Sequence, residues 1–476
     1  MLNQILTLAS IASTASIVRA VAIDSAFLEN DFSKIGSQED IYQYLYGSAP
    51  HFSYPVNNSI SLDIPETCEL VQVHLYARHG ERYPTAGSTA DGINNIWYKF
   101  GNYTQQFNGS LAFLNENYQY PFANSSNYGL LTTPDNVANP YNPLLGSTTG
   151  TTEGLEFLEL YSNILHKHEN FTAWTSNSDR VHATAEYFIR ALGDKFNVNL
   201  QTISEDASQG ANTLTPINGC PNWNETATTA ILAKYDQTFL TDISKRLNAE
   251  NVGLNLTKTD ALNMFNWCAF EINVRGYSDI CDVFTKDELI KYGYYGDLMT
   301  YYDEFIGNPL AKAVGSVPVN ATLALLNTPE DKLDQQVFLS FTHDTNLINY
   351  AAALGIFTDN APITPESIDW TTDFHRSWLV PQGARIQTQK YNCKSPNNTS
   401  ISYVRFIVND VVKPLTNCSS GPGFSCSLPD YNKFVEDRFQ DVDFYTQCGT
   451  SKVSNVTDLT FYWDYKTHDY NAPLEI

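Results

Sequence analysis

The feature that most constrains this chain is a strand-like segment that runs directly into a cluster of cationic side chains. In residues 71–77, apolar side chains alternate with polar ones, a pattern typical of a β-strand. Arg78, His79 and Arg82 follow at once, and Gly80 allows the backbone to turn sharply behind the histidine. A guanidinium group can bind two oxygens of one phosphate at the same time. An imidazole between two such groups can act as acid, base or nucleophile. The segment therefore predicts an anion site at the end of a strand.

The longer pattern Arg-His-Gly-x-Arg-x-Pro, from Arg78 to Pro84, resembles the signature of the histidine acid phosphatases. The flanking Leu-Tyr-Ala and Glu-Arg-Tyr-Pro-Thr are similar to those of the secreted fungal and yeast acid phosphatases and phytases, and the resemblance extends from about Cys68 to Cys448. It implies an α/β protein with the three-layer, phosphoglycerate-mutase-like histidine phosphatase fold, in which a mostly parallel sheet is joined by a smaller helical lobe. It also implies the hydrolysis of phosphoric monoesters.

Two further segments place chemical side chains where a predicted strand meets a helix. The strand at 171–175 precedes Arg180, at the first turn of a helix whose apolar residues recur up to Leu192. The apolar strand at 337–341 precedes His343 and Asp344, which open another helix. Ligands bind at the carboxyl ends of the strands in open parallel sheets. If these strands are neighbours, all the side chains named so far converge.

The resemblance implies a role for each of these residues. His79 is expected to be the nucleophile that forms a phosphohistidine, and Asp344 the proton donor. The expected substrate-binding residues are Arg78, Arg82, Arg180 and His343. No metal or other cofactor is required, because the arginines supply the positive charge and would repel a cation. An Asp side chain with the ordinary pKa of about 3.9 would be about half protonated near pH 4, which favours activity at acidic pH.

The composition favours an exported glycoprotein with small-molecule substrates. The net charge of −24 argues against binding to nucleic acids or anionic membranes. Residues 1–22 are largely apolar and end in Ala20-Val21-Ala22, as in a signal peptide, and no later segment approaches a membrane span. We expect a secreted protein, either extracellular, periplasmic or associated with the cell wall. Twelve Asn-x-Ser/Thr sequons are spread along the chain: Asn57, Asn102, Asn108, Asn124, Asn170, Asn224, Asn255, Asn320, Asn397, Asn398, Asn417 and Asn455.

Eight cysteines in an exported chain predict four disulfides, although the spacing alone leaves many pairings open. Two pairs are close enough in sequence to be local, namely Cys268 with Cys281 and Cys418 with Cys426. The family resemblance adds Cys68 with Cys393 and Cys220 with Cys448. Metal binding by these cysteines is not expected, because no Cys-x-x-Cys pair occurs.

The chain divides into two expected lobes. Residues 23–190 and 330–476 would form the α/β histidine phosphatase domain, with 191–329 as a mostly helical inserted lobe. In the inserted lobe, helices are expected at 225–248, 259–274 and 285–304, the last opened by a capping box from Thr285 to Glu288.

Several readings remain open at this point. Phytate (myo-inositol hexakisphosphate) is an expected substrate, but a broad-specificity acid phosphatase with little phytase activity is an alternative, since no motif locates the residues that rim the crevice. A phosphoglycerate-mutase-like transferase is disfavoured by the export signals, and a non-enzymatic anion-binding glycoprotein by the presence of Asp344. The oligomeric state is open, although the yeast members of the family suggest a homo-oligomer.

Overall fold

The computed structural model describes residues 32–53, 60–85, 87–116, 118–122, 144–167, 169–358, 361–394 and 399–475. The expected signal peptide at 1–22 lies outside these residues, as do the sequons at Asn57, Asn124, Asn397 and Asn398. No helix in the described part of the chain is long and apolar enough to cross a membrane.

One sheet of eight strands organises the described residues, in the order β3-β2-β4-β1-β5-β6-β7, with β8 paired to β6. The strands are β1 (Cys68–Arg78), β2 (Asn170–Ser176), β3 (Asn197–Ile203), β4 (Val337–Thr342), β5 (Arg385–Lys394), β6 (Ser400–Val408), β7 (Val411–Val412) and β8 (Cys426–Ser427). The pairs β3–β2, β2–β4 and β4–β1 are parallel, whereas β5 to β8 pair antiparallel. The α/β fold class is confirmed, but the sheet is mixed, not mostly parallel. Its later strands follow one another closely and pair without the crossover that a parallel pair needs.

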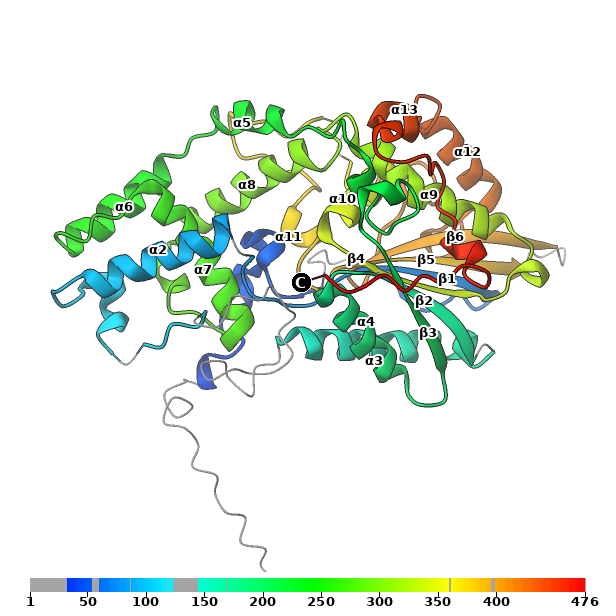
Figure 1. Cartoon of the computed structure of the whole chain (residues 1–476), viewed down its shortest axis with the longest axis horizontal. Helices are drawn as coiled ribbons and strands as arrows, with labels where there is room; N and C mark the ends of the chain where they lie inside the picture. Colours follow the sequence, from blue (N-terminus) through cyan, green and yellow to red (C-terminus); the bar gives the residue numbers. More distant parts are fainter. Residues whose placement is uncertain are drawn as a thin grey trace, which may run out of the picture.

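Helices cover both faces of the sheet (Figure 1). They are α2 (Ser88–Asn102), α3 (Gly146–Leu165), α4 (Asp179–Leu192), α5 (Thr226–Leu232), α6 (Thr238–Glu250), α7 (Lys258–Arg275), α8 (Lys286–Asp303), α9 (Ala311–Asn327), α10 (Asp344–Leu354), α11 (Arg376–Leu379), α12 (Leu428–Arg438), α13 (Phe444–Cys448) and α14 (Phe461–Asp464). Helices α3 and α4 lie on one face, whereas α9, α10 and α12 lie on the other.

The alternation in β1 decides which side chains meet each helical layer. Val73, Leu75 and Ala77 are buried in one cluster with side chains of α3 and α4, including Phe188. Tyr76, on the opposite face, belongs to the larger core that includes α10. Because both faces are buried, the carboxyl end of β1 has a single rigid position.

The helices α2 and α5 to α8 gather beside the sheet (Figure 1). The helix expected at 225–248 is in fact two, α5 and α6, separated by residues 233–237, and Asp236 Oδ1 accepts a hydrogen bond from Thr238 N at the start of α6. The capping box between Thr285 and Glu288 is present. Helix α9 was not predicted, since Pro318 lies inside it. Helix α2 packs against α7, although it lies outside residues 191–329. The proposed boundaries of the two lobes stay a prediction.

Four disulfides tie the described chain together, in the pairs named above: Cys68–Cys393, Cys220–Cys448, Cys268–Cys281 and Cys418–Cys426. The first joins β1 to β5 at the start of their pairing. The asparagines of the eight described sequons are all exposed, as N-glycosylation requires.

Candidate active site

The three predicted strand ends are adjacent in the sheet. Strand β4 lies between β1 and β2, and all three run parallel. Their carboxyl ends therefore place His79, Arg180 and Asp344 on one edge, beside the first turns of α4 and α10. The loop after β1 is held to α4, because Gly80 N donates to Thr184 Oγ1 at 3.0 Å. A Cβ on Gly80 would lie 2.7 Å from the Gly146 carbonyl oxygen, so this close approach requires glycine.

The buried imidazole of His79 has a defined tautomer. Its Nδ1 lies 2.8 Å from the carbonyl oxygen of Gly80, which can only accept, so Nδ1 carries the hydrogen and Nε2 keeps its lone pair. Burial and the charges of Arg180 and Arg78 hold the pKa of His79 well below its usual range. His79 is therefore neutral, with Nε2 available for attack on an electrophile.

Asp344 is paired with two arginines. Arg78 Nη2 lies 3.0 Å from Asp344 Oδ2, and Arg376 Nη2 lies 3.5 Å from the same oxygen. Arg78 is fixed further by hydrogen bonds from Nη1 to the carbonyl oxygens of Gly47 and Val380, at 2.5 and 2.7 Å. Arg78 is 1% exposed, so the pairing occurs away from bulk water.

The arginines of the site have buried donors without acceptors. The Nε groups of Arg78, Arg82, Arg180 and Arg376 are all buried and have no hydrogen-bond partner within the described residues. Arg82 donates from Nη1 to the carbonyl oxygen of Tyr83 and lies over the Phe270 ring. An unsatisfied buried donor costs about 1–3 kcal/mol, and more when it is charged. Four such groups in the space on either side of Asp344 indicate a site built for an anion with several oxygens.

His343 links two charged residues in this structure. Its Nε2 lies 2.7 Å from Glu205 Oε1, and its Nδ1 lies 3.3 Å from Arg180 Nη2. Burial raises the pKa of Glu205, but His343, Ser176 and Arg180 together outweigh burial and leave the pKa below its ordinary value. Both ring nitrogens are thus engaged, and His343 orients Arg180. Its expected hydrogen bond to the substrate would require Arg180 to turn away from Nδ1.

The pKa expected for Asp344 was wrong. Burial alone would raise it, but the charges of Arg78, Arg376 and Arg82 hold the pKa of this carboxyl well below its usual range. Asp344 is therefore ionised in the free site near pH 4. The pKa of Glu304 shifts in the opposite direction. Burial raises it, and the negative charge of Asp344 raises it further.

Two hollows meet at Asp344. One, of about 510 Å³, is lined by Arg180, His343, Glu205, Glu225 and Glu304 among others. The second, of about 370 Å³, is lined by Arg78, Arg82, Arg376, Tyr46, Tyr292 and Tyr295 among others. Within the described chain, no group of three or more His, Cys, Asp or Glu side chains is placed to hold a metal ion.

All six predicted site residues lie in this region, but sequence reasoning missed three others. Glu205 follows β3, and the same strand-end argument would have found it had β3 been recognised. Glu304 follows α8, and Arg376 opens the short helix α11 far along the chain. No local pattern marks either residue, since each reaches the site only through tertiary packing.

Comparisons with known proteins agree with this geometry. A model of the histidine phosphatase superfamily (branch 2) matches residues 69–409. A repressible acid phosphatase of Saccharomyces cerevisiae is 49% identical over 445 residues, 93% of this chain and 94% of that protein. A phytase of Candida albicans is 43% identical over 444 residues, 92% and 93% of the two chains. The crystal structure of the phytase from D. castellii matches with a TM-score of 0.85 and 40% identity, over 92% of this chain and 93% of that one. The chain belongs to the histidine phosphatase superfamily, branch 2.

Proposed function

We propose that this protein is a secreted, metal-independent acid phosphomonoesterase that works through a phosphohistidine. The observation that carries the proposal is the arrangement of four buried guanidinium groups with unpartnered Nε donors, three of them around the neutral His79 and that of Arg376 beside Asp344. A phosphoryl group has three nonbridging oxygens, and the charge that they carry in the transition state requires such donors. The names of the relatives, acid phosphatase and phytase, support the same reaction class.

The first step is attack by His79 Nε2 on the phosphorus. The N–P bond forms, the bond from phosphorus to the ester oxygen breaks, and Asp344 gives a proton to the departing oxygen. In the second step water attacks the phosphohistidine, its proton passes to Asp344, and the N–P bond breaks to release phosphate. Arg78, Arg82 and Arg180 hold the phosphoryl oxygens throughout both steps.

The low pKa of Asp344 explains how acid helps this reaction. Phosphate monoesters have a second pKa of about 6, so below that pH the substrate itself carries a proton. When the phosphoryl oxygens bind the guanidinium groups, their negative charge offsets the positive charge that kept Asp344 ionised. The pKa of Asp344 then rises, and Asp344 can accept the proton of the substrate. The acid form of Asp344 is thus generated by substrate binding, not by bulk pH alone.

Phytate is proposed among the substrates, because relatives named phytase match more than nine tenths of the chain. The alternative is a broad acid phosphatase with little phytase activity. It is favoured by the carboxyl groups of Glu205 and Glu225 in the larger hollow, which would repel additional phosphate groups.

The decisive experiment measures phosphate release from phytate, glycerophosphate and p-nitrophenyl phosphate at pH 4 to 5 with a chelator present. We expect full activity with chelator and strong inhibition by vanadate, which resembles the pentacoordinate transition state. Activity that is lost with the chelator and regained with a divalent ion would overturn the proposal. The ratio of kcat/KM for phytate to that for glycerophosphate distinguishes the two substrate ranges.

Export also belongs to the proposal. It is supported by the exposed sequons and the four disulfides, which form in oxidising compartments. The signal peptide and the homo-oligomer stay predictions. N-terminal sequencing of the mature protein and light scattering on a sizing column test them.

A further inference from the structure

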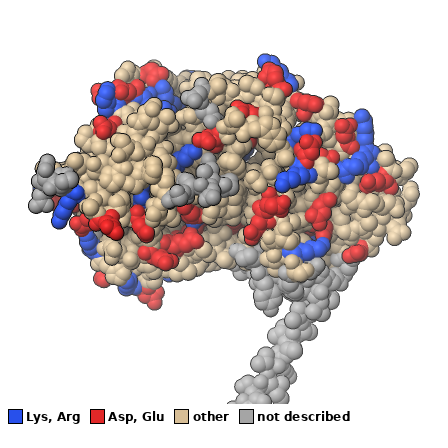
Figure 2. All heavy atoms as spheres, turned by 180° about the vertical axis from the view of Figure 1, so that it is seen from behind, with Lys and Arg blue, Asp and Glu red and all other residues tan. Residues whose placement is uncertain are grey.

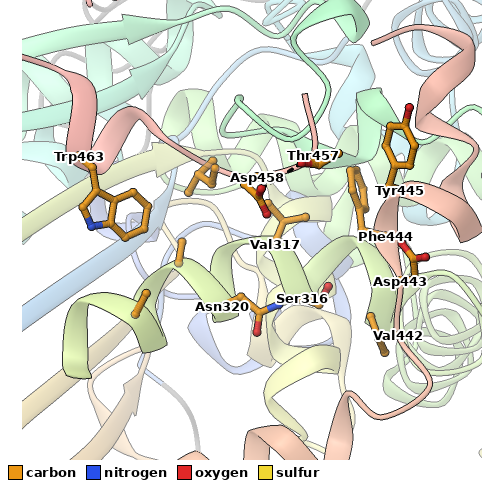
Figure 3. A pocket seen from close by; sticks show the side chains of 13 residues that line it. Ser316, Val317, Asn320, Val442, Asp443, Phe444, Tyr445, Thr457, Asp458 and Trp463 are labelled. Atoms are coloured by element: carbon orange, nitrogen blue, oxygen red, sulfur yellow. Dashed lines mark hydrogen bonds between the residues drawn. The ribbon is translucent and has the colours of Figure 1, made fainter. Parts of the chain in front are cut away.

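A third hollow on the described surface plays no part in the proposed reaction (Figure 3). It is a groove of about 400 Å³, and none of its lining residues belongs to the candidate active site. Its floor is one face of α9, and its walls are residues 442–445 and 457–459 together with Trp463 of α14. The volume is within the range of about 300–1,000 Å³ that is typical of small-molecule sites.

One residue of the groove floor begins a glycosylation sequon, Asn320-Ala321-Thr322. Asn320 is exposed, and its side chain has no hydrogen-bond partner in the part of the chain that the structure describes. Its neighbours along the floor are Ser316, Ala321 and Ala324, which are small, and Val317. The groove beside them has room for a sugar joined to the amide nitrogen.

The groove walls offer what a sugar needs for recognition. Trp463 is 44% exposed and lies at one end, with Asn320 between it and Phe444 (Figure 3). A flat indole packs well against the apolar face of a pyranose ring. Asp443 and Asp458 each accept one local hydrogen bond on a single carboxylate oxygen, from Thr446 N and from Thr457 Oγ1 respectively. The remaining carboxylate lone pairs can accept from sugar hydroxyl groups.

We propose that Asn320 carries an N-linked glycan whose first sugars pack into this groove against Trp463. The inference rests on the proposed export, because the glycan is added in the secretory pathway. The attached sugar reaches the groove without loss of translational freedom, so even weak contacts hold it there. The glycan would then bridge α9 to the segments around α13 and α14, which come from the end of the chain.

The test begins with site occupancy in the protein secreted by a yeast host, measured by mass spectrometry of glycopeptides. Asn102, the exposed last residue of α2, is a matched sequon on a helix away from the groove. Under native conditions, we expect peptide N-glycosidase to release the Asn320 glycan at least about tenfold more slowly than in the Trp463→Ala variant. Release at Asn102 should be equal in the two proteins.

A double-mutant cycle supplies an independent readout. Asn320→Gln and Trp463→Ala should each lower Tm by on the order of 1–2 °C. Trp463→Ala should have a smaller effect in the Asn320→Gln background, because only the contacts of Trp463 with protein, such as that with the Tyr462 ring, remain to be lost. Asn102→Gln should leave the effect of Trp463→Ala unchanged. Phosphatase activity should be retained in all these variants.

Three results would overturn the inference. One is an Asn320 without glycan while Asn102 is occupied, even if the groove binds an added saccharide. Another is equal release rates at Asn320 with and without Trp463. The third is additive Tm losses in the cycle. By contrast, absence of the protein from the culture medium would refute the proposed export, and a glycosylated but inactive wild-type protein would refute the proposed reaction.

Discussion

His79 is the residue on which the proposed chemistry depends most directly. Its Nδ1 donates to the Gly80 carbonyl oxygen, so its Nε2 is the free nucleophile. We predict that His79→Ala loses at least ~10³ of kcat, equivalent to about 4 kcal/mol of barrier, while the fold survives. Rapid acid-free quenching with labelled substrate should trap phosphate on His79 in the parent protein. Label on another residue would contradict the assignment.

A substitution at Asp344 tests whether this residue donates a proton or only positions its neighbours. A general acid matters only when the leaving group needs a proton, and p-nitrophenolate does not. We predict that Asp344→Asn lowers kcat on alkyl esters such as glycerophosphate by roughly 10²–10⁴. The first-turnover burst with p-nitrophenyl phosphate should fall much less.

The burst must be measured in place of steady-state turnover, because the variant also slows the attack of water on the phosphohistidine. The parent protein with both substrates is the control. Equal losses in the burst for alkyl and aryl esters would mean that Asp344 orients Arg78 and Arg376 and does not deliver the proton.

Among the helices, α9 and α10 make the contact that most directly supports the site. A Cβ on Gly315 of α9 would lie 1.9 Å from the carbonyl oxygen of Asn349 in α10, the helix that begins at Asp344. The clashing atom belongs to the backbone of α10, so it cannot move aside by a change of rotamer as a side-chain atom could. We predict that Gly315→Ala destabilises the protein by about 1–3 kcal/mol or more and lowers kcat/KM, because α10 must shift. Denaturant unfolding and initial rates measure the two effects.

Gly101 of α2 is the matched control for this substitution. A Cβ there would meet no described atom within 4 Å. Gly101→Ala should therefore stabilise the protein by up to about 1 kcal/mol through helix propensity, with unchanged activity. A Gly315→Ala protein as stable as the Gly101→Ala protein would show that the two helices are not packed as closely as described.

At the scale of the whole molecule, stability should depend on pH through a buried carboxyl group. Arg385 is shared by three carboxylates: Glu153 at 3.2 Å, and Glu156 and Asp410 at 2.6 Å each. Burial raises the pKa of Glu153 to about 8. The positive charge of Arg385 does not offset this effect, because the same guanidinium is shared with two other carboxylates. A raised carboxyl pKa contributes stability that is fully present below the unfolded value of about 4.5 and is lost as pH rises through about 8.

We therefore predict that Glu153→Gln, which keeps the neutral form at every pH, flattens the loss of Tm between pH 5 and pH 8. The variant should match the parent near pH 5 and exceed it near pH 8, by on the order of a few kcal/mol in unfolding free energy. Other groups whose pKa values are shifted, such as His74 and Glu304, cancel in the comparison. A variant that is less stable than the parent by the same amount at all pH values would contradict this.

The overall charge and the site charge have opposite signs. The chain has a net charge of −24, yet four arginines converge at one edge of the sheet. Figure 2 shows that, on the face opposite to the view of Figure 1, Lys and Arg side chains are interspersed with Asp and Glu and do not gather in one patch. This distribution fits a small anionic substrate that is bound by a local focus of positive charge.

The sequence by itself determined the features that depend on chain neighbours. The alternation in β1, the strand–loop–helix units at Arg180 and Asp344, and the capping box of α8 were all predicted and are present. Each follows from the preferences of a few consecutive residues, so each is written locally. The family resemblance then supplied the roles, which the structure makes geometrically possible.

Only the tertiary structure decided how these residues behave chemically. It brought Glu304 and Arg376 to the site from segments without a recognisable motif, and Glu205 from the end of a strand that was not predicted. It also lowered the pKa of Asp344, which the sequence had suggested would be ordinary. Burial and Coulomb interactions depend on distances through space, and residues far apart in the sequence set those distances. A motif can therefore name the reacting groups, whereas the packed fold decides their charge.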